Sequence, residues 1–513
     1  MQKMKNGKKV LSVCLSLAMA AGMLSTSAFA SWNVYGGSNN HNAVVTEAPT
    51  RPDKSGLDSY IQLHCTGSGW DGVDNVPVLQ TVNGTTYAYV LYDGYGASGA
   101  LVAKIRCAEN GGSSIVWTTD PYGTEGTSLN AKSGFQLSTP YLDDNGTPND
   151  ASDDTLYVGT ISQYDDYEGG EWLTGTGSKV MALTGLDQNK PTVTNVLTGI
   201  NGQINTPITT DGTYLYFGTW PGGSNAGTYY QVKLSDYSVK TFTPDSYGFY
   251  WAGAVSDGTN VYFGSDNGLL YWRSIADFDT TGGVLDLTDV ASDAGNVRST
   301  VMMDEDGFLY FTTQGGYLWC CSYKDGLTVE WHIKLGATST STPTKVGDRI
   351  YVGYYSGFNA GGVQCVTVSI GEDGSSYIPS VAPVASGFPV QSSIVVMGDG
   401  TGTDYLYFNT NAQKGAGYCY SYDGGTTGSK VWGTTGDTYA LGGMAIDNGY
   451  AVFGNDYNHL YVGYFSAKPG RLCLGGSIVC DEEKNSFLAV GRVAPVIALQ
   501  SCRHGGKFCY NRH

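Results

Sequence analysis

The densest group of potential metal ligands in the chain lies between residues 143 and 154. Its candidate ligands are Asp143, Asp144, Asn145, Asp150, Asp153 and Asp154. Calcium takes about six to eight oxygen ligands and tolerates irregular loops of this kind. The spacing does not match an EF-hand, which ends in a bidentate glutamate. A solvated turn region is the simplest interpretation, and calcium binding is the functional hypothesis.

Four aromatic residues are candidates for contact with a ligand: Trp172, Trp220, Tyr250 and Trp251. Aromatic side chains with a polar edge suit carbohydrate or protein ligands. The alternative is that they pack between strands, because large aromatic residues also dominate protein cores. Both interpretations stay open for each of the four.

A second set of potential metal ligands lies near the carboxyl end: Cys473, Cys480, Cys502, His504, Cys509 and His513. They lack the close CxxC pairs that fix a tetrahedral zinc site, so two disulfides or disorder are simpler interpretations. The sequence contains no GxSxG elbow, HExxH motif or phosphate-binding glycine loop. A nucleophilic hydrolase therefore has little support.

A repeated strand pattern must position these residues. Residues 211–219, DGTYLYFGT, combine an Asp-Gly turn with a short aromatic and β-branched strand, and related copies recur along the chain. Eight copies are anchored at Tyr89, Tyr157, Tyr216, Tyr262, Tyr310, Tyr351, Tyr407 and Val452, with spacings of 41 to 68 residues. Such repeats predict an all-β fold, a β-propeller of eight four-stranded blades. Seven blades would follow if the degenerate first copy forms no blade of its own.

The eighth repeat shows three strands, near residues 440–446, 451–454 and 460–464, and no obvious fourth. A missing strand would leave an exposed edge that invites aggregation. Trp32 and Val34 alternate with polar neighbours as strand residues do. We therefore predict that an amino-terminal strand at residues 32–35 completes the last blade.

The chain divides into three parts by composition. Residues 1–30 have a lysine-rich start, an apolar stretch and a small-residue cleavage site at Ala28, Phe29 and Ala30, which predicts a secretory leader. Residues 31–466 carry the propeller repeats, and residues 467–513 form a basic tail without them. No later apolar run is long enough to span a membrane. The expected location is secreted or at the cell surface.

Charge separates the propeller from its tail. Residues 31–467 contain 17 Lys and Arg against 43 Asp and Glu, a formal charge of −26, whereas residues 468–513 carry +4. A strongly acidic surface repels nucleic acid and anionic membranes. Nucleic acid is therefore not an expected partner.

Several repeats end in an outer strand that bears tryptophan, at Trp117, Trp331 and Trp432, and two begin with Ser-Thr-Pro at residues 138–140 and 341–343. In these features the chain resembles the PQQ-like (quinoprotein alcohol dehydrogenase-like) repeat propellers. The resemblance implies that each of these tryptophans docks against the neighbouring blade. That family includes both quinone-dependent dehydrogenases and non-catalytic scaffolds, so it does not settle function.

The resemblance raises an enzymatic alternative, a PQQ- and calcium-dependent oxidoreductase. Such enzymes can carry a disulfide between adjacent cysteines, as Cys320 and Cys321 are. However, Cys320 occupies the same repeat position as Cys365 and Cys419, which predicts a buried core residue. The family's catalytic carboxylates cannot be placed residue by residue in this sequence, so none is assigned. The favoured function is an exported, non-catalytic binding or scaffold module for an extracellular protein or carbohydrate, without PQQ and with calcium as the candidate metal.

Overall fold

The computed structural model describes the chain in two compact units, residues 1–470 and 471–513. Within them the described residues are 32–46, 48, 58–64, 72–94, 99–120, 126–129, 131, 135–161, 164–168, 171–174, 177–324, 326–372, 374–464, 478–481, 486–489, 503–504 and 507–508. The predicted secretory leader lies outside these residues.

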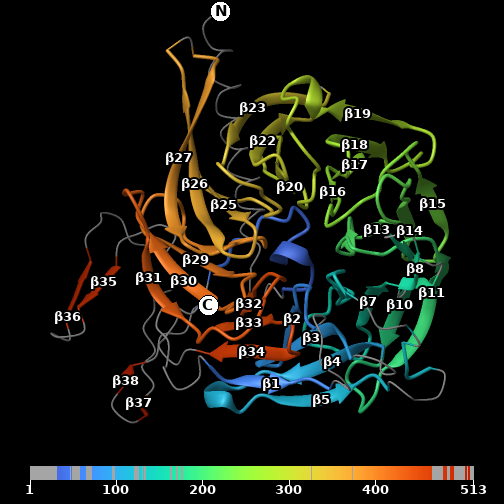
Figure 1. The fold of residues 1–513 in the computed structure, drawn as a ribbon. Coiled ribbons are helices and arrows are strands. Elements are labelled where there is room, and N and C mark those ends of the chain that lie inside the picture. Colours follow the sequence, from blue (N-terminus) through green and yellow to red (C-terminus); the bar gives the residue numbers. More distant parts are fainter. Residues whose placement is uncertain are drawn as a thin grey trace, which may run out of the picture. The chain divides into compact units, whose positions relative to one another are not determined.

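The first unit is built from eight four-stranded antiparallel sheets, arranged as the blades of a propeller (Figure 1). This confirms the predicted all-β, eight-bladed fold, and the degenerate first copy does form its own blade. Blades 1 to 4 are β2 (Val78–Val82), β3 (Thr85–Asp93), β4 (Ala100–Arg106), β5 (Ser114–Thr118); β6 (Tyr141–Asp143), β7 (Thr155–Thr160), β10 (Ser178–Thr184), β11 (Thr192–Ile200); β12 (Thr209–Thr210), β13 (Tyr214–Gly218), β14 (Tyr229–Lys233), β15 (Val239–Phe242); and β16 (Val255–Ser256), β17 (Asn260–Gly264), β18 (Leu269–Ser274), β19 (Gly282–Asp286).

The second half of the ring repeats the same order from the innermost strand outward. Blades 5 to 8 are β20 (Met302–Met303), β21 (Phe308–Thr313), β22 (Tyr317–Ser322), β23 (Thr328–Lys334); β24 (Thr344–Val346), β25 (Arg349–Ser356), β26 (Ala360–Ile370), β27 (Tyr377–Ser386); β28 (Val395–Met397), β29 (Asp404–Asn409), β30 (Gly417–Tyr422), β31 (Ser429–Gly433); and β32 (Ala445–Asp447), β33 (Tyr450–Gly454), β34 (His459–Tyr464), β1 (Tyr60–Gln62). A hairpin of β8 (Tyr164–Glu168) and β9 (Glu171–Thr174) extends blade 2, and single 3-10 turns lie at Tyr35–Gly37, Glu109–Gly111 and Leu287–Asp289.

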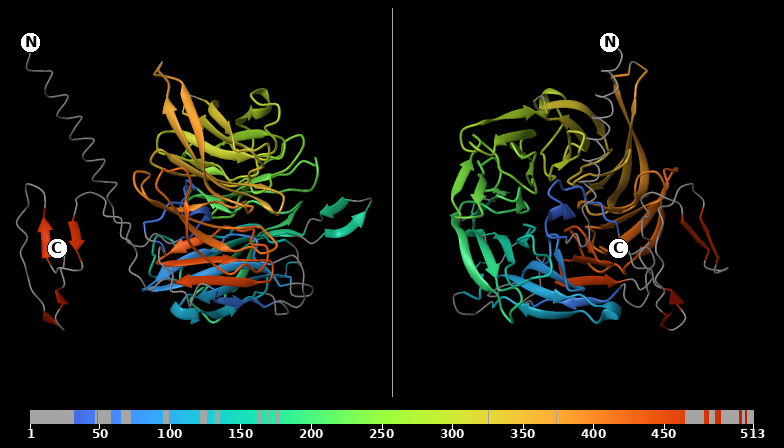
Figure 2. Two further views of the ribbon diagram at one scale, coloured as in Figure 1. Left: turned by 60° about the vertical axis from the view of Figure 1, so that its left-hand side comes forward. Right: turned by 180° about the vertical axis from the view of Figure 1, so that it is seen from behind.

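The eighth blade is closed by an amino-terminal strand, but not by the predicted one. Its outermost strand is β1, which pairs antiparallel with β34 so that Tyr60 faces Tyr461 and Gln62 faces His459. The prediction that residues 32–35 fill this place is wrong. Trp32 and Val34 are buried as an alternating strand would have them, yet Trp32 packs in a core cluster with blades 7, 8 and 1 and Val34 in one with blades 2 and 3. The amino-terminal segment of the described chain lies in the middle of the ring (Figure 2). Alternating burial of these residues is expected both for an outer strand of blade 8 and for a segment in the middle of the ring, so the pattern does not distinguish the two positions.

The repeated Asp-Gly turn works as the sequence predicts. Gly212 has a φ of +86°, a conformation that glycine adopts without strain. One carboxylate oxygen of Asp211 accepts the N–H groups of Thr213 and Tyr214 at 2.8 Å, and the other accepts the hydroxyl of Tyr216 at 2.7 Å. The aspartate therefore caps the turn and satisfies the anchor tyrosine of the following strand.

Blades 5 and 7 place their anchor tyrosine, a cysteine and an outer tryptophan in the same register. In blade 5, Tyr310 faces Cys320, which faces Trp331 on the outer strand; in blade 7, Tyr407 faces Cys419, which faces Trp432. These cysteines are buried, so the predicted core role is confirmed.

The glycine that ends the repeat lies where the next blade approaches. An added Cβ at Gly264 would lie 2.2 Å from Cγ1 of Val297, in the segment that leads into blade 5. The corresponding distances are below 3 Å at Gly159, Gly218, Gly353 and Gly454, each toward a side chain that precedes the following blade. The motif therefore ends in glycine because blades pack closely there.

The second unit contains two short hairpins among its described residues. β35 (Ile478–Asp481) pairs with β36 (Ser486–Ala489), and β37 (Arg503–His504) pairs with β38 (Lys507–Phe508). The side chains of the candidate zinc ligands lie outside the described part of the chain, and zinc binding there stays untested.

Candidate ligand-binding site

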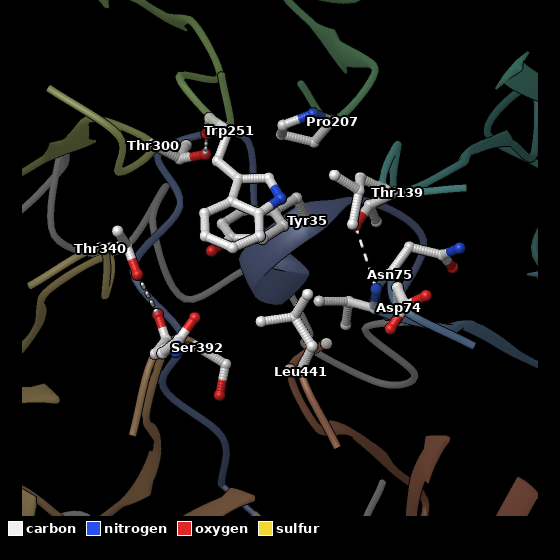
Figure 3. Close-up of a pocket in the computed structure, with 15 residues that line it drawn as sticks. Tyr35, Asp74, Asn75, Thr139, Pro207, Trp251, Thr300, Thr340, Ser392 and Leu441 are labelled. Carbon is white, nitrogen blue, oxygen red and sulfur yellow. Dashed lines mark hydrogen bonds between the residues drawn. The ribbon is translucent and has the colours of Figure 1, made fainter. Parts of the chain in front are cut away.

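A pocket lies on the axis of the ring, and the space within it, including the solvent at its open mouth, is about 440 Å³. We call it the axial cup (Figure 3). Every blade contributes to its wall from the segment just ahead of its innermost strand. The contributing residues include Val76, Thr139, Pro207, Trp251, Thr300, Thr340, Ser392 and Gly443.

The amino-terminal segment, residues 32–46, fills the axis next to the cup, and we call it the axial segment. Five innermost strands each donate the backbone N–H of their second residue to it: Leu79, Leu142, Met303, Lys345 and Val396. Their acceptors are the main-chain oxygens of residues 32, 33, 40 and 43 and the side-chain oxygen of Asn42. The segment thus satisfies strand edges that would otherwise face an open channel.

Two aromatic side chains of the axial segment fix its course. Nε2 of His41 lies 2.8 Å from the carbonyl oxygen of Ala254 in blade 4, and its Nδ1 lies 3.0 Å from that of Tyr35. Burial lowers the pKa of His41, so the imidazole is neutral at pH 7. The hydroxyl of Tyr35 lies 3.0 Å from that of Thr342, and burial raises its pKa. Tyr35 therefore lines the cup as a neutral ring.

Of the four aromatic residues that the sequence offered as ligand contacts, Trp251 is among the residues that line the cup. Its backbone has a φ of +57°, a costly conformation for a large L-residue. Thr300 holds this backbone, because its hydroxyl donates to the carbonyl oxygen of Trp251 at 3.1 Å and accepts the N–H of Gly253 at 3.2 Å. Trp251 and Tyr35 both line the cup (Figure 3). Strained backbones of this kind concentrate at functional sites.

Tyr250 contacts Trp251, and Trp220 contacts Tyr250, but both residues also engage other protein groups. Nε1 of Trp220 donates to Asp266 at 3.0 Å, and its ring meets that of Tyr250 edge-on at 5.4 Å. Arg298 lies over the Tyr250 ring at 4.4 Å and forms a two-point ion pair with Asp266, whose Oδ1 accepts Nε at 2.7 Å. Burial alone would lower the pKa of Arg298, but the hydrogen bonds and the negative charge of Asp266 outweigh burial. The pKa of Arg298 is therefore raised above its usual value. This cluster buttresses Trp251 through the 5.0 Å contact of Tyr250.

The remaining aromatic candidate, Trp172, lies in β9 opposite Tyr167 of β8. Its side chain lies outside the described residues, so its part in binding stays a prediction. Sequence reasoning missed Tyr35, Asp74 and the polar wall of the cup. One signal for them was present, because the Ser-Thr-Pro motifs supply Thr139, which lines the cup, and Thr342, which contacts Tyr35.

The acidic loop lies between β6 and β7, at the opposite end of the innermost strand from the cup. Its carboxylates bond within the loop. Asp143 accepts the N–H of Asn145, Asp144 accepts that of Gly146, Asp150 accepts both donors of Ser152, and Asp153 accepts the hydroxyl of Thr147. Within the described residues, no three His, Cys, Asp or Glu side chains gather as they would around a metal. Calcium binding here stays a prediction.

Asp154 differs from the rest of the loop because its side chain is only 1 % exposed. Oδ2 accepts a hydrogen bond from Nε2 of Gln80. Burial, reinforced by the neighbouring carboxylates Asp144, Asp153 and Asp150, raises the pKa of Asp154 to about 6 despite that bond.

We expect Asp154→Asn to raise the melting temperature at pH 8 by about 1–3 °C. An unfolded aspartate has a pKa of about 3.9, so the folded protein binds this proton more tightly, and ionisation destabilises the fold above about pH 6. Asparagine removes that charge and keeps an acceptor for Gln80. The gain should vanish below about pH 4. Thermal melts from pH 4 to 8 measure it.

Asp150→Asn is the matched control, because Asp150 is exposed and the hydrogen bonds of Ser152 lower its pKa. It should give no gain at pH 8. A loss of stability in Asp154→Asn that appears only with calcium present would contradict the buried-charge account and favour a calcium site.

The residues around the cup do not fit a quinone cofactor. PQQ is a tricarboxylate, yet none of the fifteen lining residues is Lys, Arg or His. Calcium beside it would require several oxygen ligands with carboxylates among them, and Asp74 is the one carboxylate of the lining set. Cys320 and Cys321 are free thiols that belong to separate core clusters on opposite faces of β22. The geometry therefore gives the oxidoreductase alternative no support.

Together, the ring and the cup define an eight-bladed β-propeller with an aromatic pocket on its axis. No family model matches the chain, and no curated protein sequence matches it. Among solved structures, it is similar to BamB from Moraxella catarrhalis, with 12 % identity over 79 % of this chain and 98 % of that chain and a TM-score of 0.44. It is also similar to a europium-containing methanol dehydrogenase, with 11 % identity over 85 % and 90 % of the two chains and a TM-score of 0.49. The likeness concerns the fold alone.

The described part of the chain contains no helix with the length and hydropathy needed to cross a membrane.

Proposed function

We propose that this protein is an exported, non-catalytic binding module that holds a carbohydrate unit in the axial cup. The observation that carries the proposal is Trp251, held by Thr300 in a strained backbone conformation on the wall of a cavity. Pockets that combine apolar walls with a few convergent polar groups are the usual sites of small ligands.

The lining matches both the apolar face and the polar edge of a sugar ring. The C–H face of a pyranose packs against an aromatic plane, which Trp251 and Tyr35 offer. Its hydroxyl groups require donors and acceptors around the edge, which Thr139, Thr340 and Ser392 offer.

Trp251→Ala should weaken saccharide binding at least about 30-fold, because truncating a central aromatic contact costs about 2 kcal/mol or more. The test is a screen of immobilised glycans with the intact protein, followed by calorimetry on the best ligand. Trp272→Phe is the matched control, since Trp272 lies in β18 of the blade that follows Trp251 and is not among the residues that line the cup. It should change the affinity less than about threefold.

Equal affinity of wild type and Trp251→Ala would place the sugar elsewhere and contradict the proposal. Capture of proteins alone, with no glycan bound, would also contradict it. Stoichiometric quinone binding with dye-linked turnover, after reconstitution with PQQ and calcium, would overturn the non-catalytic assignment.

A further inference from the structure

The axial segment reaches every blade of the ring next to the cup. Its hydrogen bonds join it to the innermost strands of blades 1, 2, 5, 6 and 7, and Nε2 of His41 lies 2.8 Å from the carbonyl oxygen of Ala254 in blade 4. The two remaining blades are reached through clusters of apolar side chains. Val34 packs in one core cluster with Ile208, which leads into blade 3, and Trp32 packs in another with the innermost strand of blade 8. The segment therefore crosses the middle of the ring with contacts on all sides.

The turn of the axial segment that adjoins the cup is tightly packed. This turn, Tyr35–Gly37, lies in the middle of the ring (Figure 1). A Cβ added at Gly37 would lie 2.6 Å from Cε3 of Trp32, so the indole fills the space beside the turn. Tyr35 lines the cup, and its hydroxyl lies 3.0 Å from that of Thr342. A ligand that enters the cup therefore meets the Tyr35 ring and main chain, and a glycan has no passage onward through the described part of the axis.

The wall of the cup surrounds the axis. All eight blades contribute to it, so that Thr139 of blade 2 and Thr340 of blade 6, on opposite sides of the ring, both line it. The space within, with the mouth included, is about 440 Å³, toward the lower end of the range for small-ligand pockets. The cup is therefore a blind pocket with a single mouth.

A blind pocket distinguishes the units of a glycan by their number of neighbours. An internal sugar unit is joined to the chain by two glycosidic bonds, and a terminal unit is joined by one. In the cup, one side of the ligand faces Tyr35 and its edge faces the wall, so the mouth is the direction left for a substituent. An internal unit would press its second neighbour against the wall or stay out of contact with Trp251.

We propose that the cup binds the terminal unit of a glycan and excludes internal units. This rests on the proposed carbohydrate function and narrows its ligand class to saccharides with a free chain end. The terminal ring packs against the aromatic side chains and bonds to the hydroxyl groups of the wall, while the rest of the glycan leaves through the mouth. A glycan without a free end does not bind.

The test changes the number of chain ends without changing the sugar. The probes are dextran, mannan, galactan, xylan, a β-1,3-glucan and the tightest-binding glycan of the screen. Each is titrated into the full chain by calorimetry, intact and after partial acid hydrolysis to short oligosaccharides. For each glycan that binds, a tenfold rise in the number of ends should lower the dissociation constant per sugar unit about tenfold, because only the ends count as ligand. The dissociation constant per chain end should stay the same.

A site for internal units would instead give equal dissociation constants per sugar unit before and after hydrolysis. That result would overturn end recognition and leave the carbohydrate function standing. Trp251→Ala should weaken binding of the hydrolysates, whereas Trp272→Phe, outside the cup, should not. Equal binding of the hydrolysates by Trp251→Ala and wild type would place the chain end elsewhere and contradict the proposal. The wild-type comparison requires no variant, so it decides the question even if Trp251→Ala does not fold. Binding of no glycan at all would overturn both proposals.

Discussion

Trp32→Ala should lower the free energy of unfolding by about 3–5 kcal/mol, the usual cost of truncating a buried tryptophan. Trp32 is 3 % exposed and belongs to a core cluster that joins blades 7, 8 and 1. Its backbone oxygen accepts the N–H of Leu79 at 2.8 Å. Losing the indole therefore removes packing from three blades and weakens the attachment of the axial segment, which lies next to the cup. Chemical denaturation of the full chain measures the effect.

Trp32→Phe keeps most of the apolar volume and should cost less than half as much. If Trp32→Ala unfolded at the wild-type denaturant concentration, the axial segment would not be held on the axis. The cup provides a second measurement. Because Tyr35 follows Trp32 by three residues and lines the cup, Trp32→Ala should also weaken saccharide binding.

Gly264→Ala should cost about 1–3 kcal/mol, although alanine is normally the better residue in regular structure. The new methyl group would lie 2.2 Å from Cγ1 and 2.4 Å from Cβ of Val297. Val297 cannot move away easily, since it is fully buried and its N–H bonds to Ser265 at 2.9 Å. Relief requires blades 4 and 5 to separate, and urea unfolding reports that cost.

The matched control is Gly402→Ala, where an added Cβ meets nothing within 4 Å and the backbone is not left-handed. It should be neutral or slightly stabilising. Equal destabilisation by the two variants would show that loss of glycine itself, and not the approach of the next blade, sets the cost.

The fold was predictable because its information is local and repeated. Two parts of the repeat, the Asp-Gly turn and the anchor tyrosine, bond to each other within one blade, and the terminal glycine makes room for the next blade. Because the pattern recurs in eight blades, each copy makes the others easier to recognise in the sequence. The closing strand was misplaced because β1 is only three residues long and none of the three is buried, so it gives little apolar signal in the sequence. Residues 32–35 alternate more clearly, but their burial reflects packing in the middle of the ring and not a place in the eighth blade.

The site was only partly predictable because the cup is assembled from all eight blades. Each contributes one or a few residues whose types are ordinary in loops, and no spacing in the sequence links Asp74 to Trp251 or Thr340. Aromatic composition pointed to Trp251, Tyr250 and Trp220 together, but only their contacts separate the residue that faces the cavity from the two beside it.

The axial segment also determines which hydrogen bonds would bear a mechanical load applied from the amino-terminal side. β1 runs antiparallel to β34 and joins it through three facing residue pairs, so a pull on its amino-terminal end would unzip them one at a time. Residues 32–46 precede β1 in the chain and are bonded to innermost strands around the ring. A load from the amino-terminal side therefore meets an anchor shared by several blades before it reaches the short ladder that closes the ring.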